Sequence, residues 1–111
     1  MPNTRTRSAV SLRGAVQAVQ RGFRGYVDAL ASRETVEVSV PELPDEPLLL
    51  SYLVAASMIL DLPVRQQLLA EPDAERRLGA ERTLLARETT MLRSLTATPA
   101  PDLRNTPYNP N

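Results

Sequence analysis

The chain has 111 residues, and its 13 Arg balance 13 Asp and Glu, so its net charge is zero. It contains no Lys, His or Cys, which excludes zinc-finger and haem sites, thiol and imidazole catalysis, a phosphate-binding loop with its lysine, and a Schiff base. We therefore expect one small domain that is not an enzyme and holds no metal or cofactor. The zero net charge also argues against nucleic acid as its main partner.

Hydropathy gives no sign of membrane insertion. No apolar run reaches the roughly 18 to 20 residues that span a bilayer, and the polar start MPNTRTRS is unlike a signal peptide. The sequence therefore predicts a cytoplasmic protein without a membrane partner.

The abundance of Ala, Leu, Arg and Glu favours an all-α fold, because these residues have high helix propensity. We expect a helical bundle of about four helices, two long and two shorter, with an extended Val/Pro connector and an irregular Pro-rich C-terminal tail. Residues 8–96 are predicted to form the bundle, residues 1–7 a disordered or non-native start, and residues 97–111 the extended tail.

The first long helix is predicted over residues 8–32. Its large apolar residues recur every three or four positions, which places them on one face of the helix. They are Leu12, Val16, Val19, Phe23, Val27 and Leu30. Gly14, Gly22 and Gly25 lower the helix propensity, and they either allow another element to approach closely or have no packing role.

Residues 33–46 interrupt the helical pattern. Within them, residues 35–40 read TVEVSV, an alternation that puts three valines on one face, as in a strand. A single strand has no partner inside a helical domain. We therefore favour an extended connector that lays its valines on the helices over a strand that pairs with another chain.

A second helix is predicted over residues 48–60. It starts at Asp45-Glu46-Pro47, where a carboxylate caps the first turn and proline is tolerated. Its sequence, LLLSYLVAASMIL, is almost wholly apolar, which predicts a central helix that is buried on all sides. Asp61-Leu62-Pro63 ends this helix and, by the same capping chemistry, starts a short helix over residues 64–70.

The second long helix is predicted over residues 74–95, after the break at Pro72-Asp73. Leu78, Leu85 and Leu92 recur every seven residues, a spacing typical of a packed helix face. This repeat, joined by Leu84, Met91 and Leu95, predicts the packed face of the helix.

The same helix carries charged residues at a spacing of four. Arg77 lies four residues after Asp73 and four before Glu81. We place both pairs on the solvent-exposed face, where each would contribute only about a few tenths of a kcal/mol.

The tail, TPAPDLRNTPYNPN, cannot continue a helix because it contains four prolines. It is predicted either to be disordered or to form an extended strip with Leu103 and Tyr108 as anchors.

Five residues are candidates for a protein-binding surface: Phe23, Tyr26, Tyr52, Met58 and Tyr108. A binding surface would place the aromatic residues or Met58 at the rim of an apolar groove between helices. Core packing is nevertheless the favoured interpretation of Phe23, Tyr26 and Met58, and of the apolar run as a whole. The acidic groups at residues 45–46 and 71–75 are better explained by capping and solvation than by a metal ion.

Residues 60–88, LDLPVRQQLLAEPDAERRLGAERTLLARE, resemble the helical half of the N-terminal domain of Lon protease, also called ATP-dependent protease La. The resemblance lies in Gln67-Leu68-Leu69, the acidic break Glu71-Pro72-Asp73, and Arg77-Leu78 followed by a long helix of leucines and charges. The end of the chain, NTPYNPN at residues 105–111, is similar to the end of small stand-alone Lon-domain proteins, which lack the ATPase and the peptidase.

The resemblance spans residues 8–111, and the β-rich, PUA-like half of the family domain has no counterpart, so the chain looks like a truncated domain. It implies a non-catalytic module that recognises unfolded or tagged protein substrates for ATP-dependent proteolysis, or that binds the β-rich half of its parent protein. The alternative is a structural module that supports the missing half or self-associates as a homodimer. No catalytic residue of the family falls in this region, so none is carried over.

Overall fold

The computed structural model describes residues 4–34, 39–40 and 42–97. This part of the chain forms four helices and no strand, which confirms the predicted all-α bundle with two long and two shorter helices. The helices are α1 (Thr4–Glu34), α2 (Pro47–Ser57), α3 (Leu62–Ala70) and α4 (Ala74–Ala97).

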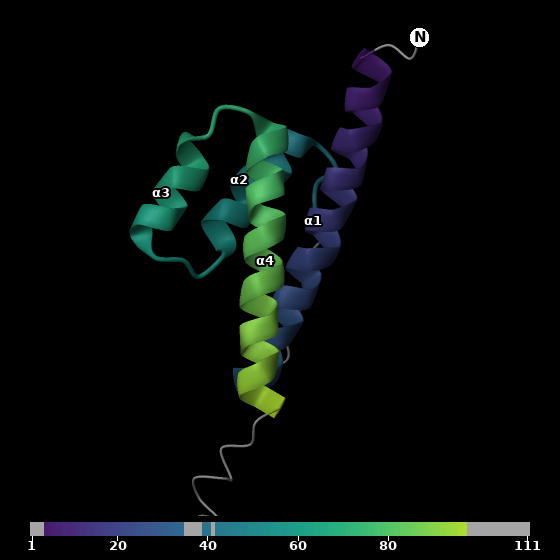
Figure 1. Cartoon of the computed structure of the whole chain (residues 1–111). Coiled ribbons are helices and arrows are strands. Elements are labelled where there is room, and N and C mark those ends of the chain that lie inside the picture. Colours follow the sequence, from purple (N-terminus) through teal and green to yellow (C-terminus); the bar gives the residue numbers. More distant parts are fainter. Residues whose placement is uncertain (1–3, 35–38, 41, 98–111) are drawn as a thin grey trace, which may run out of the picture.

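The two long helices, α1 and α4, pack side by side and run in the same direction (Figure 1). Ser11 in α1 donates a hydrogen bond to Glu75 in the first turn of α4, over 2.9 Å. Further along, a Cβ atom at Gly22 would lie 3.4 Å from Cδ1 of Leu85. Gly22 therefore faces α4 at a distance that would still accommodate a Cβ atom, and Gly14 has no neighbour within 4 Å of such an atom, so neither position requires glycine for packing.

The core lies where α1, α2 and α4 meet. Its buried apolar residues are Val16, Val19, Phe23, Tyr26, Leu43, Leu50, Val54, Met58, Leu78 and Leu85. The seven-residue repeat is confirmed as a packed face, because Leu78 and Leu85 are fully buried and Leu92 packs against the core from the side. The repeat faces α1, so the contact between α1 and α4 buries its leucines.

The start of α2 follows the predicted capping chemistry. The Glu46 carboxylate accepts hydrogen bonds from the backbone N–H groups of Leu48 and Leu49, over 3.2 and 2.8 Å, and Pro47 occupies the first turn. The side chain of Gln20 in α1 holds the loop before it by donating to the Pro44 carbonyl and to Oδ1 of Asp45. Residue chemistry and one tertiary contact together fix where α2 begins.

Two helix starts differ from the prediction. The third helix begins at Leu62 rather than at residue 64, and Asp61 stands at its N-cap without a side-chain hydrogen bond to the helix, so the predicted carboxylate cap is wrong there. The first helix begins at Thr4, which places part of the predicted disordered start in a helix. Helix ends are set by packing as much as by local chemistry, which explains shifts of a few residues.

The connector and the tail are only partly described. Residues 35–38 and 41, which include most of the strand-like alternation, lie outside the described residues, as does the tail from residue 98 onward. Val40 and Leu43 do pack against the core. This agrees with the favoured connector that lays apolar side chains on the helices.

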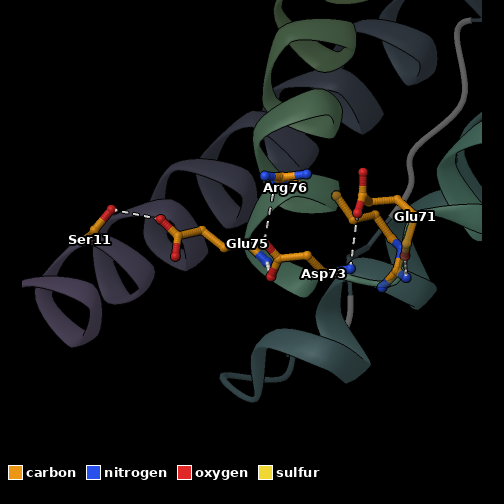
Figure 2. Close-up of polar contacts among 6 residues, drawn as sticks. Ser11, Glu71, Asp73, Glu75 and Arg76 are labelled. Carbon is orange, nitrogen blue, oxygen red and sulfur yellow. Dashed lines mark hydrogen bonds and ion pairs between the residues drawn. The ribbon is translucent and has the colours of Figure 1, made fainter. Parts of the chain in front are cut away.

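The start of α4 is organised by short-range polar contacts (Figure 2). Glu71 accepts a hydrogen bond from the backbone N–H of Asp73, and Asp73 accepts one from Glu75. The carboxylate of Asp73 lies 3.7 Å from Arg76 in an exposed ion pair. The Asp73 carboxylate thus caps the first turn of α4, as predicted, whereas the Glu71 carboxylate accepts from the loop that precedes the helix.

Within the described residues, no helix is long and apolar enough to cross a membrane, and no group of three acidic, His or Cys side chains is placed to hold a metal ion.

Candidate functional site

The outer face of α2 is apolar and exposed. Its buried face consists of Leu50, Ser51, Val54 and Ala55. The opposite face carries Leu48, Leu49, Tyr52 and Leu53, which are 44%, 61%, 41% and 39% exposed; these four residues are called the α2 face below. The prediction of a central helix buried on all sides is therefore wrong, because α2 contacts α1, α3 and α4 but leaves these four side chains partly exposed.

Large exposed apolar side chains are concentrated in one region of the described chain. Seven of the nine such residues lie between positions 48 and 69, and only Met91 and Leu95 lie on α4. Beyond the α2 face, the seven include Ile59, Leu62 and Leu69, which lie around and on α3. A single exposed Leu is normal on a protein surface, but a helix with an entire apolar outer face is typical of a surface that contacts another chain.

A buried arginine holds this region together. The Arg77 side chain in α4 is fully buried, and it donates hydrogen bonds to the Leu68 carbonyl over 2.8 Å and to Oγ of Ser51 over 2.9 Å. It also donates to the carbonyl of Glu71. One guanidinium thus joins α2, the end of α3 and the loop that follows α3, using N–H groups on all three of its nitrogens.

The predicted solvent-exposed position of Arg77 and Glu81 is therefore wrong. Both side chains are buried, and Arg77 contacts α2, the end of α3 and the loop after it. The spacing of four residues places both side chains on the same face of the helix, but it does not show whether other elements cover that face.

Arg77 also positions one member of the α2 face. Its guanidinium carbon lies 4.2 Å from the centre of the Tyr52 ring, a cation–π geometry. Its Nη2 atom is 3.5 Å from the Tyr52 hydroxyl. Tyr52 is thereby fixed to α4, while Leu49 is the most exposed member of the α2 face.

Glu81 lies one helical turn after Arg77, and its carboxyl is fully buried with no hydrogen-bond partner among the described residues. Burial raises the pKa of Glu81 from 4.5 to about 8, against the opposing effect of the Arg77 charge. At neutral pH this side chain is therefore a neutral carboxylic acid inside the bundle.

We expect the protein to lose stability between about pH 5 and pH 8 because of Glu81. In this range the unfolded chain releases the proton that the folded chain retains, so the free energy of unfolding falls as the pH rises, by up to about 1.4 kcal/mol per pH unit. Glu81→Met should remove this slope and be clearly more stable than the wild type at pH 8, but not at pH 5. Urea unfolding of the wild type and of Glu81→Met at pH 5 and pH 8 measures the difference in their free energies of unfolding. A difference between them that does not change with pH would contradict the prediction.

The structure separates the five candidate binding residues. Phe23, Tyr26 and Met58 are buried in the core, as their favoured interpretation held, and the Tyr26 hydroxyl accepts a hydrogen bond from the backbone N–H of Ile59. Tyr52 is exposed on the α2 face. Tyr108 lies outside the described residues.

Sequence reasoning missed three members of the α2 face, Leu48, Leu49 and Leu53, by assigning them to the core. No periodicity could have distinguished them, since both sides of α2 are apolar. The available signal was the small number of predicted helices: two long helices and one short helix are too few to cover a fourth helix on every side.

Comparison with known protein families, with characterised proteins and with solved structures finds no match. The described part of the chain is therefore characterised by its own geometry: a four-helix bundle with one unpartnered apolar helix face.

Proposed function

We propose that this chain is a non-catalytic recognition module that binds segments of other proteins through the α2 face. The observation that carries the proposal is the exposure of Leu48, Leu49, Tyr52 and Leu53 on one side of a single helix. The resemblance of residues 60–88 to the helical half of the Lon N-terminal domain supports it. Under that resemblance, the segments bound would be parts of unfolded or tagged substrates of ATP-dependent proteolysis.

The size of the α2 face is suited to holding a few side chains of an unfolded chain. Burying one Leu completely contributes about 1.5 to 3 kcal/mol, and these residues are already partly covered. The whole face can therefore support a weak and reversible contact. Reversible binding suits a module that must pass a chain on to another part of a machine.

The test is binding of a permanently unfolded protein, such as reduced and carboxymethylated lactalbumin, measured by fluorescence anisotropy. We expect the double variant Leu49→Ala/Leu53→Ala to lose at least about tenfold in affinity, which corresponds to about 1.4 kcal/mol. Ala preserves the helix because it has the highest helix propensity. The melting temperature of the variant should stay close to that of the wild type.

The matched control is Met91→Ala, which removes an equally exposed apolar side chain (53%) from α4. It should leave binding unchanged. If both variants bind as the wild type does, or if native lactalbumin binds as well as the unfolded form, the α2 face is not a recognition surface. A dimer in light scattering that the Leu49→Ala/Leu53→Ala variant dissociates would favour the alternative, a self-association module.

A further inference from the structure

The α2 face is bounded by carboxylates. From residue 39 to residue 64 the sequence has four acidic residues and no Arg; the four are Glu42, Asp45, Glu46 and Asp61, and all are exposed. Asp45 and Glu46 directly precede the helix, and Asp61 follows it within four residues of its end. The apolar side chains of α2 therefore lie between negative charges at both ends.

Two arginines near this surface offset part of these charges. Arg65 directs its guanidinium to the last carbonyls of α2, donating to Ala55 over 3.2 Å and to Met58 over 2.6 Å. At the other end, Arg13 of α1 borders a groove of about 490 Å³ that Asp45 and Pro47 also line. Each end of α2 has one Arg nearby, and the start of the helix, with Asp45 and Glu46, therefore keeps an excess of carboxylates.

The groove lies between α1 and the start of α2. Its apolar lining is Leu12, Val16 and Pro47, and Pro47 directly precedes Leu48 of the α2 face in the sequence. A bound segment that covers Leu48 and Leu49 and continues past the start of α2 would lie near Asp45 and Glu46. Its polar side chains would meet negative charge at this point.

We propose that the α2 face selects protein segments in which large apolar side chains are flanked by Lys or Arg. The inference rests on the proposed function and adds the charge of the segment. Apolar contact with Leu49 and Leu53 supplies the affinity. The carboxylates of Asp45 and Asp61 attract basic flanks and repel acidic ones, which sets the specificity and the salt dependence.

Three synthetic peptides of equal length test the inference by fluorescence anisotropy with the full chain. The first carries leucines flanked by Lys and Arg, the second carries the same leucines flanked by Glu, and the third carries the basic residues with every Leu replaced by Ser. We expect the first to bind at least about tenfold more tightly than either of the others at low salt. Its affinity should fall as the salt concentration rises.

The variant Asp45→Asn/Asp61→Asn removes two charges with little change in shape. Asn keeps the oxygen that accepts from Gln20 at position 45, and position 61 has no side-chain cap bond to lose. We expect the preference for the basic peptide over the acidic one to fall at least about threefold. Asp73→Asn, at the start of α4, is the matched control and should leave the preference unchanged.

The outcomes separate the inference from the function on which it rests. If the basic and acidic peptides bind equally and both lose affinity in Leu49→Ala/Leu53→Ala, the recognition function stands and the charge inference is wrong. If no Leu-containing peptide binds, both are wrong. If the Leu-free basic peptide binds as well as the first, the surface is an electrostatic site, and the inference is also overturned.

Discussion

Leu85→Glu is expected to unfold the protein, or to lower its free energy of unfolding by at least several kcal/mol. Leu85 is buried in the longest helix contact of the molecule, with its side chain against Gly22. A carboxylate at this position would lose its hydration without gaining a partner, and the Leu contacts would be lost as well. Small domains have only about 5 to 15 kcal/mol of stability in total. Circular dichroism with urea titration measures the loss.

Leu95→Glu is the matched control, because it places the same charge on the same helix at a side chain that is 57% exposed. Its free energy of unfolding should change by less than about 0.5 kcal/mol. Similar effects from the two substitutions would mean that the packed face of α4 is misassigned. So would a folded Leu85→Glu protein of unchanged stability.

Arg77→Met is expected to destabilise the protein by about 3 to 5 kcal/mol, because three acceptors lose their donor at a cost of about 1 to 3 kcal/mol each. The substitution leaves Oγ of Ser51 and the carbonyls of Leu68 and Glu71 without their donor. It also removes the nearby cation from the buried Glu81 carboxyl. Since these groups belong to three segments, α2 and α3 should loosen from α4 together.

Arg76→Met is the control, because Arg76 lies one position earlier and forms only an exposed ion pair with Asp73. It should change stability by less than about 1 kcal/mol. The double variant Arg77→Met/Glu81→Met should be more stable than Arg77→Met alone, since it removes the buried carboxyl that has no hydrogen-bond partner among the described residues. Urea unfolding of the four proteins measures both effects. Equal losses for Arg76→Met and Arg77→Met would show that the buried contacts contribute little.

The sequence by itself determined the elements of this protein. Helix-forming composition and apolar spacing predicted the helices, and Glu46 with Pro47 identified the start of α2. The repeat of Leu78 and Leu85 identified the packed face of α4. These features depend on interactions within one or two helical turns, so local chemistry is sufficient to predict them.

Only the tertiary structure decided which surfaces those helices share. An apolar sequence on both sides of α2 does not reveal that Leu49 is exposed and Leu50 buried, because this depends on where α1 and α4 lie. A spacing of four does not show that Arg77 and Glu81 are both buried. Burial is a property of the whole packing arrangement, since a residue's neighbours come from distant segments. The absence of Lys, His and Cys restricts the chemistry of the protein, whereas the packing of the helices determines the one apolar face that we propose binds other chains.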